Sequence, residues 1–182
     1  MILELIERLS REAGKRELDF LLIGGHAVIQ HGYPRMTLDV DFLCRTQQRD
    51  QWRAVLEPYG YKVYSEANAF SQFAGAPNWP KVDLMFVNDG TFEKLKKESV
   101  KKESLRVPSV QHLIALKLHA TRSATRSSPQ KDWGDIEALI RLHRLDPATQ
   151  DFHDLILRYG GEESLVRIRE MWQRFLMQER HQ

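Results

Sequence analysis

The chain has few of the features that would assign it to a specialised class of protein. It contains one cysteine, Cys44, among 182 residues, which excludes an intramolecular disulfide and fits a reducing compartment. Its 27 lysine and arginine residues stand against 25 aspartate and glutamate residues, and the resulting net charge of +2 gives no general attraction to nucleic acid or anionic membranes. With 42% hydrophobic residues and no low-complexity tract, the chain can bury a core of one domain or two small ones.

Long hydrophobic runs are also missing. No apolar stretch has the length needed to span a bilayer. Residues 1–9 are amphipathic and contain early acids, whereas a signal peptide begins with basic residues and continues with an uninterrupted apolar run. We therefore expect a soluble, cytoplasmic protein with no membrane partner.

The pattern of the first 107 residues is typical of an α/β domain. Apolar residues at helical spacing predict a first helix before Gly14, and apolar runs bounded by turn residues predict strands. The expected strands are residues 18–23, 38–44, 61–64 and 81–87, and the expected later helices are residues 27–31 and 47–56. The segment that follows, up to Phe73, has no clear pattern, and Asn88-Asp89-Gly90 is typical of a turn.

From Pro108 onward the pattern is helical. Ser109 is a candidate N-cap for a helix over residues 110–118, and apolar residues from Trp133 to Ile140 indicate a second helix. Two more helices follow, with a break at Gly160-Gly161. We therefore expect a first domain at residues 1–107 and a helical domain at residues 108–182.

Three acids occupy strand positions where apolar residues predominate. Asp39 and Asp41 are two residues apart on one expected strand and would project from the same face, while Asp83 is on a later strand. A carboxylate on a buried strand is costly unless it is paired, hydrogen-bonded or bound to metal. The alternatives are exposure on an edge strand, a buried arginine partner, or a metal site, and the metal site is favoured.

A metal site of this kind implies phosphate chemistry. If the two strands are neighbours, the three carboxylates form an all-oxygen site that suits Mg²⁺, which takes substrate phosphates as its remaining ligands. Two such ions roughly 3.5–4 Å apart can serve both the attacking and the leaving oxygen of a nucleotidyl transfer.

A glycine pair precedes the acids. Gly24 and Gly25 follow an expected buried strand and precede a helical pattern, so backbone N–H groups there could face a triphosphate with no Cβ in the way. The pair is neither a dinucleotide fingerprint nor a P-loop, because the further glycines and the Gly-Lys-Ser/Thr ending are missing. His26 either donates to a phosphate or has a structural hydrogen-bonding role.

These motifs together resemble the DNA polymerase beta-like nucleotidyltransferase superfamily. Its signature is a strand, a Gly-Gly or Gly-Ser turn into a helix, a strand with an acid-x-acid pair, and a third acid on a later strand. Residues 21–27, 38–42 and 82–86 match this signature in order and spacing. Many members have serine or threonine after the first glycine, whereas this chain has Gly25.

A narrower resemblance is to the minimal nucleotidyltransferases of the AbiEii-like toxin group. It begins with residues 24–27 and continues through Gly32, Arg35 and Thr37 to the acid pair. Residues 113–118 and 131–139 are similar to that group's helical lysine motif and its later Lys-Asp-x-x-Asp helix. The resemblance covers about residues 18–142 and leaves the tail unassigned.

The resemblance implies an α/β (α+β) nucleotidyltransferase fold, in which a mixed sheet flanked by helices is followed by a C-terminal helical bundle that closes the nucleotide cleft. In that interpretation Asp39 and Asp41 coordinate nucleotide-bound Mg²⁺, and Asp83 completes a second metal site and guides the proton of the acceptor hydroxyl. Lys117 is then a catalytic contact of the phosphates if its side chain faces the cleft; the alternative is that the side chain extends from the apolar helix to solvent. The implied nucleotide-binding residues are Gly24, Gly25, Arg35, Thr37, Lys131 and Asp135. Asp135 either orients Lys117 or contacts the base; the alternative is that Asp132 and Asp135 are only charges at a helix N-terminus.

The implied reaction transfers a nucleoside monophosphate from a nucleoside triphosphate to an acceptor hydroxyl and releases pyrophosphate. In the toxin-like branch the acceptor is tRNA or another RNA, and a separate antitoxin protein is the partner. Relatives with a similar signature instead modify aminoglycoside or lincosamide antibiotics. A catalytically silent, antitoxin-like binding module with the same fold is a third interpretation, against which the three intact acids argue.

Overall fold

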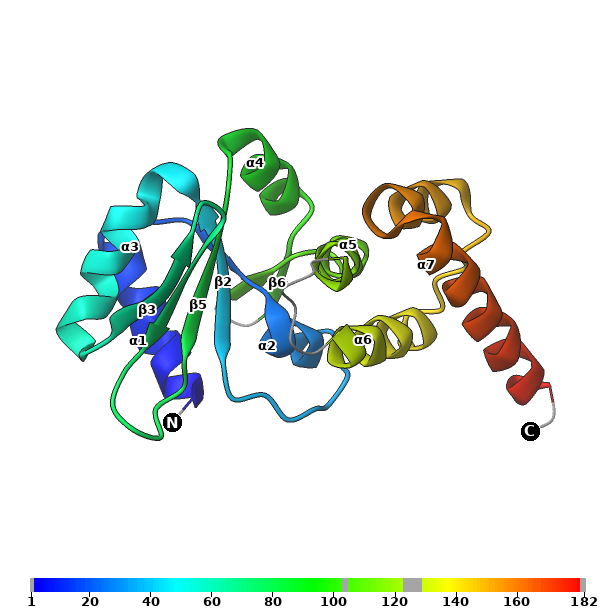
Figure 1. Ribbon diagram of the computed structural model, residues 1–182, viewed down its shortest axis with the longest axis horizontal. Coiled ribbons are helices and arrows are strands. Elements are labelled where there is room, and N and C mark those ends of the chain that lie inside the picture. Colours follow the sequence, from blue (N-terminus) through cyan, green and yellow to red (C-terminus); the bar gives the residue numbers. More distant parts are fainter. Residues whose placement is uncertain (1, 103–104, 123–128, 181–182) are drawn as a thin grey trace. The chain divides into compact units, whose positions relative to one another are not determined.

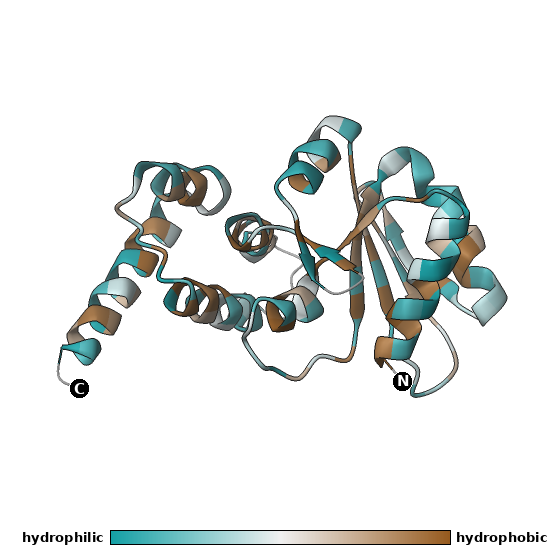
Figure 2. Cartoon of the chain, turned by 180° about the vertical axis from the view of Figure 1, so that it is seen from behind, coloured by the Kyte–Doolittle hydropathy of each residue, from teal (hydrophilic) through white to brown (hydrophobic). Residues whose placement is uncertain are grey.

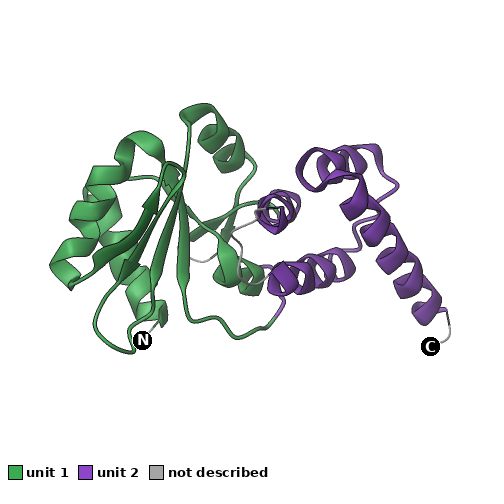
Figure 3. Cartoon of the chain, in the orientation of Figure 1, with its two compact units in different colours: residues 1–30, 34–109 green, residues 31–33, 110–182 purple. Residues whose placement is uncertain are grey.

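The computed structural model describes residues 2–102, 105–122 and 129–180. The chain divides into two compact units, coloured separately in Figure 3. Unit 1 comprises Met1–Gln30 and Pro34–Ser109, and unit 2 comprises His31–Tyr33 and Val110–Gln182. The sequence prediction places the division between residues 107 and 108.

Unit 1 is built around a five-stranded mixed sheet with the order β1-β2-β5-β4-β3 (Figure 1). The central strands β2 and β5 run parallel, while β1 pairs with β2, β4 with β5, and β3 with β4 in antiparallel fashion. The elements of unit 1 are α1 (Ile2–Lys15), β1 (Phe20–Leu22), α2 (Gly24–Gln30), β2 (Val40–Arg45), η1 (Thr46–Gln48), α3 (Arg49–Leu56), η2 (Glu57–Tyr59), β3 (Lys62–Ala67), β4 (Phe70–Ala74), β5 (Val82–Val87), α4 (Asp89–Lys97), β6 (Val100–Lys102) and β7 (Leu105–Val107).

The core of unit 1 lies between the sheet and the helices α1 and α3, which cover one face of it (Figure 1). The ring of Phe42 on β2 lies 4.9 Å from that of Phe20 and 5.6 Å from that of Trp52 on α3, between ring centroids. Along β5, Val82, Leu84 and Phe86 are buried while the residues between them are partly exposed. Figure 2 shows the apolar residues concentrated in these central strands. The alternation turns Asp83 toward the face opposite α3.

Strand β2 begins later than predicted. Residues 38–44 were expected to be extended, but the strand starts at Val40 and ends at Arg45. Leu38 is 68% exposed, and Asp39 is exposed as well. The prediction that Asp39 lies on a buried strand was therefore wrong. The apolar side chain of Leu38, which suggested a buried strand, lies mostly outside the core.

Two further parts of unit 1 differ from the sequence interpretation. The segment up to Phe73, for which no element was predicted, includes most of β4, in which a buried Ser71 and the half-buried Gln72 hide the usual alternation. Asn88-Asp89-Gly90 does not form a simple turn, since Asn88 is the N-cap of α4 and its side chain accepts a hydrogen bond from Thr91 N at 2.8 Å. The same asparagine chemistry serves turns and helix caps.

Unit 2 is helical. It contains α5 (Val110–Thr121), α6 (Pro129–Leu142) and α7 (Gln150–Glu179), and α5 packs against both of the others. The break predicted at Gly160-Gly161 is confirmed, because Gly161 has φ 79° and ψ 179° inside α7. In the described part of the chain, none of the helices has both the length and the apolar character that crossing a membrane requires.

Candidate active site

Four polar side chains line up across the sheet of unit 1, and we call them the acid row: Asp41, Asp83, Gln72 and Ser65. They belong to β2, β5, β4 and β3 in that spatial order, and each is the register partner of the next. Directly paired residues of neighbouring strands project from the same face of a sheet. The juxtaposition of the acid-x-acid strand with the Asp83 strand, which the metal-site hypothesis requires, is thus present for Asp41 and Asp83.

Asp83 is held in place by Gln72. The side-chain Nε2 of Gln72 donates a hydrogen bond to Asp83 Oδ2 at 2.8 Å. A hydrogen bond to a charged carboxylate is stronger than one between neutral groups, so it fixes the orientation of the Asp83 carboxylate. Sequence reasoning missed Gln72, because its importance depends on the antiparallel pairing of β4 with β5.

Gly24 allows the chain to approach Asp41 closely. The residue has φ +63°, and a Cβ built on it would lie 2.5 Å from Asp41 Cγ and closer still to Oδ2. On the preceding residue, Ile23 N donates to the backbone oxygen of Asp41 at 2.9 Å. In the structure, the absence of a side chain at Gly24 makes room for the Asp41 carboxylate.

Arg35 and Thr37 lie against the second glycine. A Cβ on Gly25 would be 2.5 Å from Thr37 Oγ1 and 3.0 Å from Arg35 Nη1. His26, the next residue of α2, is buried, and its Nε2 has no hydrogen-bond partner among the residues described. Burial and the nearby positive charge of Arg35 lower the pKa of His26, which favours the neutral imidazole.

Asp39 is placed differently from the other two acids. It is exposed and precedes β2, while Asp41 and Asp83 are half-buried. Within the described ranges, no group of three or more His, Cys, Asp or Glu side chains is arranged to hold a metal ion. The adjacent carboxylates of Asp41 and Asp83 still suit Mg²⁺, which binds through one or two protein carboxylates and fills its other positions with water and phosphate oxygens.

Lys117 and Asp135 come together inside unit 2. Lys117 Nζ on α5 lies 2.6 Å from Asp135 Oδ2 and 3.2 Å from Asp132 Oδ1, both on α6, and all three side chains are buried. The contact places Asp135 where it can orient the lysine. Lys131, in contrast, is exposed on α6.

An ion-pair cluster surrounds Asp19 in unit 1. Its Oδ2 accepts hydrogen bonds from Lys96 Nζ at 2.7 Å and from Arg45 Nη2 at 3.3 Å. Arg45 ends β2 and also pairs with Asp89 and Glu93 on α4. Burial opposes ionisation of Asp19, but the two basic partners outweigh it and lower the pKa of the carboxyl below its usual value of 3.8. This cluster joins β2 to α4 and contains no predicted site residue.

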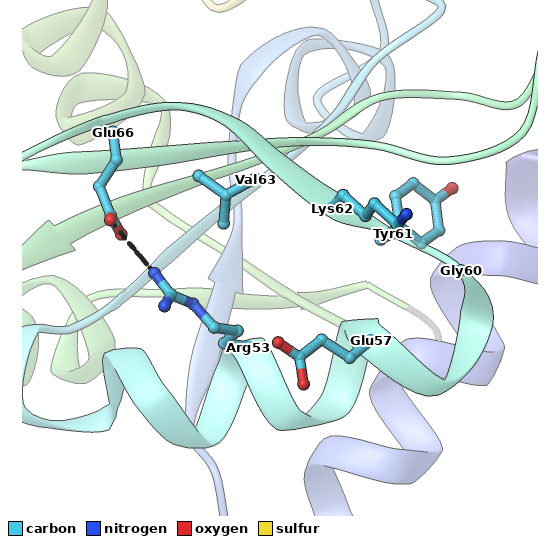
Figure 4. Close-up of a pocket in the computed structure, with 7 residues that line it drawn as sticks. All are labelled: Arg53, Glu57, Gly60, Tyr61, Lys62, Val63 and Glu66. Carbon is cyan, nitrogen blue, oxygen red and sulfur yellow. Dashed lines mark hydrogen bonds and ion pairs between the residues drawn. The ribbon is translucent and has the colours of Figure 1, made fainter.

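A surface pocket of about 520 Å³ lies beside α3 (Figure 4). Its lining residues are Arg53, Glu57, Gly60, Tyr61, Lys62, Val63 and Glu66. Arg53 and Glu66 form an ion pair across it, with Nη2 and Oε1 3.0 Å apart. None of the predicted site residues lines this pocket, so we place the candidate site at the acid row.

Comparison with known proteins connects this geometry to a fold. No protein-family model and no curated protein sequence matches the chain. Among solved structures, ANT(2″)-Ia in complex with adenylyl-2″-tobramycin is similar, with a TM-score of 0.64, 17% identity, and coverage of 86% of this chain and 95% of that one. The lincomycin-bound lincosamide antibiotic adenylyltransferase LnuA has a TM-score of 0.56 at 15% identity, covering 76% of this chain and 98% of its own.

A third similar structure is a nucleotidyltransferase-like protein from Paracoccidioides brasiliensis. Its TM-score is 0.55 at 16% identity, with 96% of this chain and 91% of that chain covered. At such identities the similarity establishes the fold. The predicted nucleotidyltransferase fold, a mixed sheet flanked by helices and followed by C-terminal helices, is confirmed.

Proposed function

We propose that this protein is a metal-dependent nucleotidyltransferase, which transfers a nucleoside monophosphate from a nucleoside triphosphate to an acceptor hydroxyl. The observation that carries the proposal is the register pairing of Asp41 with Asp83 on adjacent parallel strands, with Gly24 directly against Asp41. Similarity in fold to ANT(2″)-Ia and LnuA supports the same reaction class.

The reaction assigns a role to each member of the site. The acceptor oxygen attacks the α-phosphorus, the bond from that phosphorus to the bridging oxygen breaks, and pyrophosphate leaves. Asp83, oriented by Gln72, receives or guides the hydroxyl proton. Asp41 and the exposed Asp39 would hold nucleotide-bound Mg²⁺, with Asp83 as a ligand of a second ion. Magnesium, when bound, supplies positive charge to the phosphate oxygens.

The triphosphate would be bound first by groups around the glycine pair. Arg35 and Thr37 lie against Gly25, where a guanidinium and a hydroxyl can donate to phosphate oxygens. On the resemblance of their motifs, we assign Lys117 and Lys131 as further phosphate contacts. The 2.6 Å ion pair with Asp135 supports a role for that aspartate in orienting Lys117.

Two acceptor classes follow from different observations. Residues 113–118 and 131–139 resemble motifs of the toxin-like branch, which favours tRNA or another RNA as acceptor and an antitoxin as protein partner. The similar folds of ANT(2″)-Ia and LnuA favour an antibiotic as the second candidate acceptor.

The test is a transfer assay on the full chain. Purified protein is incubated with Mg²⁺ and each labelled nucleoside triphosphate, separately with total RNA, an aminoglycoside and a lincosamide. We expect labelled RNA, loss of labelling in Asp41→Asn and Asp83→Asn and on chelation of the metal, and normal labelling in Asp50→Asn, whose carboxylate is exposed on α3. Labelling that survives both site variants would refute the site, and nucleotide binding without transfer to any acceptor would show a silent module.

A further inference from the structure

A pairing irregularity in β3 places Tyr64 beside the acid row, which the sequence alone did not indicate. Val63 pairs with Phe73 and Ser65 pairs with Gln72, and the register shifts between them, so Tyr64 is the extra residue of a β-bulge. Phe73 pairs with Val82 on the face that packs against α3, whereas Ser65 belongs to the acid row. Bulges redirect side chains and are common beside active sites. Because side chains alternate along a strand, Tyr64 points away from the face to which Val63 points. Tyr64 therefore projects, with Ser65, from the face that carries the acids.

The surroundings of Tyr64 agree with this placement. Burial raises the pKa of the Tyr64 phenol, as do the negative charges of Asp83 and Asp39, while Lys81 acts in the opposite direction. The ammonium of Lys81 lies 4.9 Å from the centre of the Tyr64 ring. The side chain nevertheless remains 49% exposed, so a large part of the ring is available to a ligand.

The strand order separates two sides of the site. α2 and its glycine pair lie beside β2, the strand of Asp41, whereas Tyr64 lies on β3 at the far edge of the sheet. Asp83 stands on β5 between them. If the triphosphate occupies the glycine side, then the acceptor must reach Asp83 from the side of β3 and β4, because the attacking oxygen enters opposite the leaving pyrophosphate.

We propose that Tyr64 and Lys81 form the acceptor-binding surface and that the acceptor is a single-stranded RNA end. This inference rests on the proposed nucleotidyl transfer. An aromatic face beside a cation is the combination with which proteins bind single-stranded nucleic acid, since the ring stacks on a base and the cation pairs with a phosphate.

The test separates acceptor binding from nucleotide binding. For a single-stranded RNA acceptor, we expect Tyr64→Ala to raise KM by about 10-fold, the size of one lost base stack, and to leave KM for the nucleoside triphosphate unchanged. Tyr64→Phe keeps the ring and should behave as wild type. Lys81→Gln should weaken RNA binding and reduce its salt dependence, because one phosphate contact is lost.

Matched controls exist elsewhere in unit 1. Tyr59 in η2 is half-buried beneath the guanidinium of Arg8, 5.9 Å from its ring centre, so Tyr59→Ala removes a cation-covered tyrosine away from the acid row. Lys94→Gln removes an exposed lysine of α4. Both variants should keep the wild-type KM for RNA.

A second readout needs no turnover, namely the Kd of a short fluorescein-labelled single-stranded RNA measured by anisotropy. Unchanged Kd and KM in Tyr64→Ala would overturn the acceptor surface even if the wild type transfers nucleotides efficiently. Modification of an aminoglycoside but not of RNA by the wild type would overturn it as well. If wild type transfers to no acceptor, the proposed function itself fails, and this inference fails with it.

Discussion

The close approach of Gly24 to Asp41 gives a prediction whose size follows from the geometry. In Gly24→Ala the new Cβ would lie 2.5 Å from Asp41 Cγ. Ordinary carbon–carbon contacts are about 3.5–4.0 Å, so the carboxylate or the start of α2 must move by about 1 Å. A displacement of that size at a catalytic group can cost about 100-fold in rate. We therefore expect kcat to fall by about two orders of magnitude.

The positive φ of Gly24 adds a separate effect on stability. At φ +63° an alanine costs about 1–2 kcal/mol in the folded state. Gly60→Ala isolates this cost, because Gly60 has φ +77° and nothing lies within 4 Å of its would-be Cβ. Gly14→Ala, in α1, has neither a positive φ nor a nearby atom and should be neutral or slightly stabilising.

The assay combines steady-state transfer with thermal unfolding of all three variants. Gly24→Ala and Gly60→Ala should both lose stability, but only Gly24→Ala should lose activity. Transfer activity in Gly24→Ala equal to that of Gly60→Ala would refute the reasoning, since backbone strain would then explain the whole effect and the position of the Asp41 carboxylate would be unimportant.

Three further predictions concern groups around and outside the acid row. Gln72→Leu should lower kcat while leaving KM for the nucleoside triphosphate unchanged, because Asp83 loses the hydrogen bond that orients it; steady-state kinetics will show this. Lys117→Met should destabilise unit 2 by about 3–5 kcal/mol in denaturant unfolding, since two buried carboxylates lose their cation. Asp19→Asn should lower Tm at pH 7, and the difference from wild type should vanish as the pH falls below 3.8, because the lowered pKa of Asp19 stabilises the fold only while the carboxyl is ionised.

Part of the framework that carries the candidate site could be predicted from the sequence. The apolar runs predicted the bounds of β5 to within one residue. Because successive side chains of a strand point to opposite faces, Asp83 points away from the core. The metal-site hypothesis required the strands of Asp41 and Asp83 to be neighbours, and in the structure they pair directly. These features are local patterns, or follow from a motif whose strand order is fixed by the fold.

Features that depend on pairing between distant segments were not predictable. Gln72 gains its role from the antiparallel register of β4 with β5, and the patterning of β4 is obscured by the polar residues Ser71 and Gln72, whose side chains form hydrogen bonds to carboxylates of the neighbouring strands. Tyr64 could not be singled out, because a bulge is defined by two pairings and leaves no trace in one strand's composition. For Lys117, Asp135 was already a predicted partner, whereas the second contact, with Asp132, was not predicted.

The order of the strands makes the kinetic effects of substitutions separable. Gly24 and Gly25 border the inner strand β2, Tyr64 lies on the edge strand β3, and Asp83 is on β5, between β2 and β3. Conservative changes in the surroundings of Gly25, such as Thr37→Val, should therefore raise KM for the nucleoside triphosphate alone, while changes at Tyr64 should raise KM for the acceptor alone. Asp83 faces both substrates, so its substitution should lower kcat and should not selectively change the KM of either substrate. A substitution near Gly25 that raised the KM of the acceptor, or one at Tyr64 that raised the KM of the nucleoside triphosphate, would mean that the two substrates do not approach Asp83 from opposite sides. The division of the sheet into a nucleotide side and an acceptor side would then have to be abandoned.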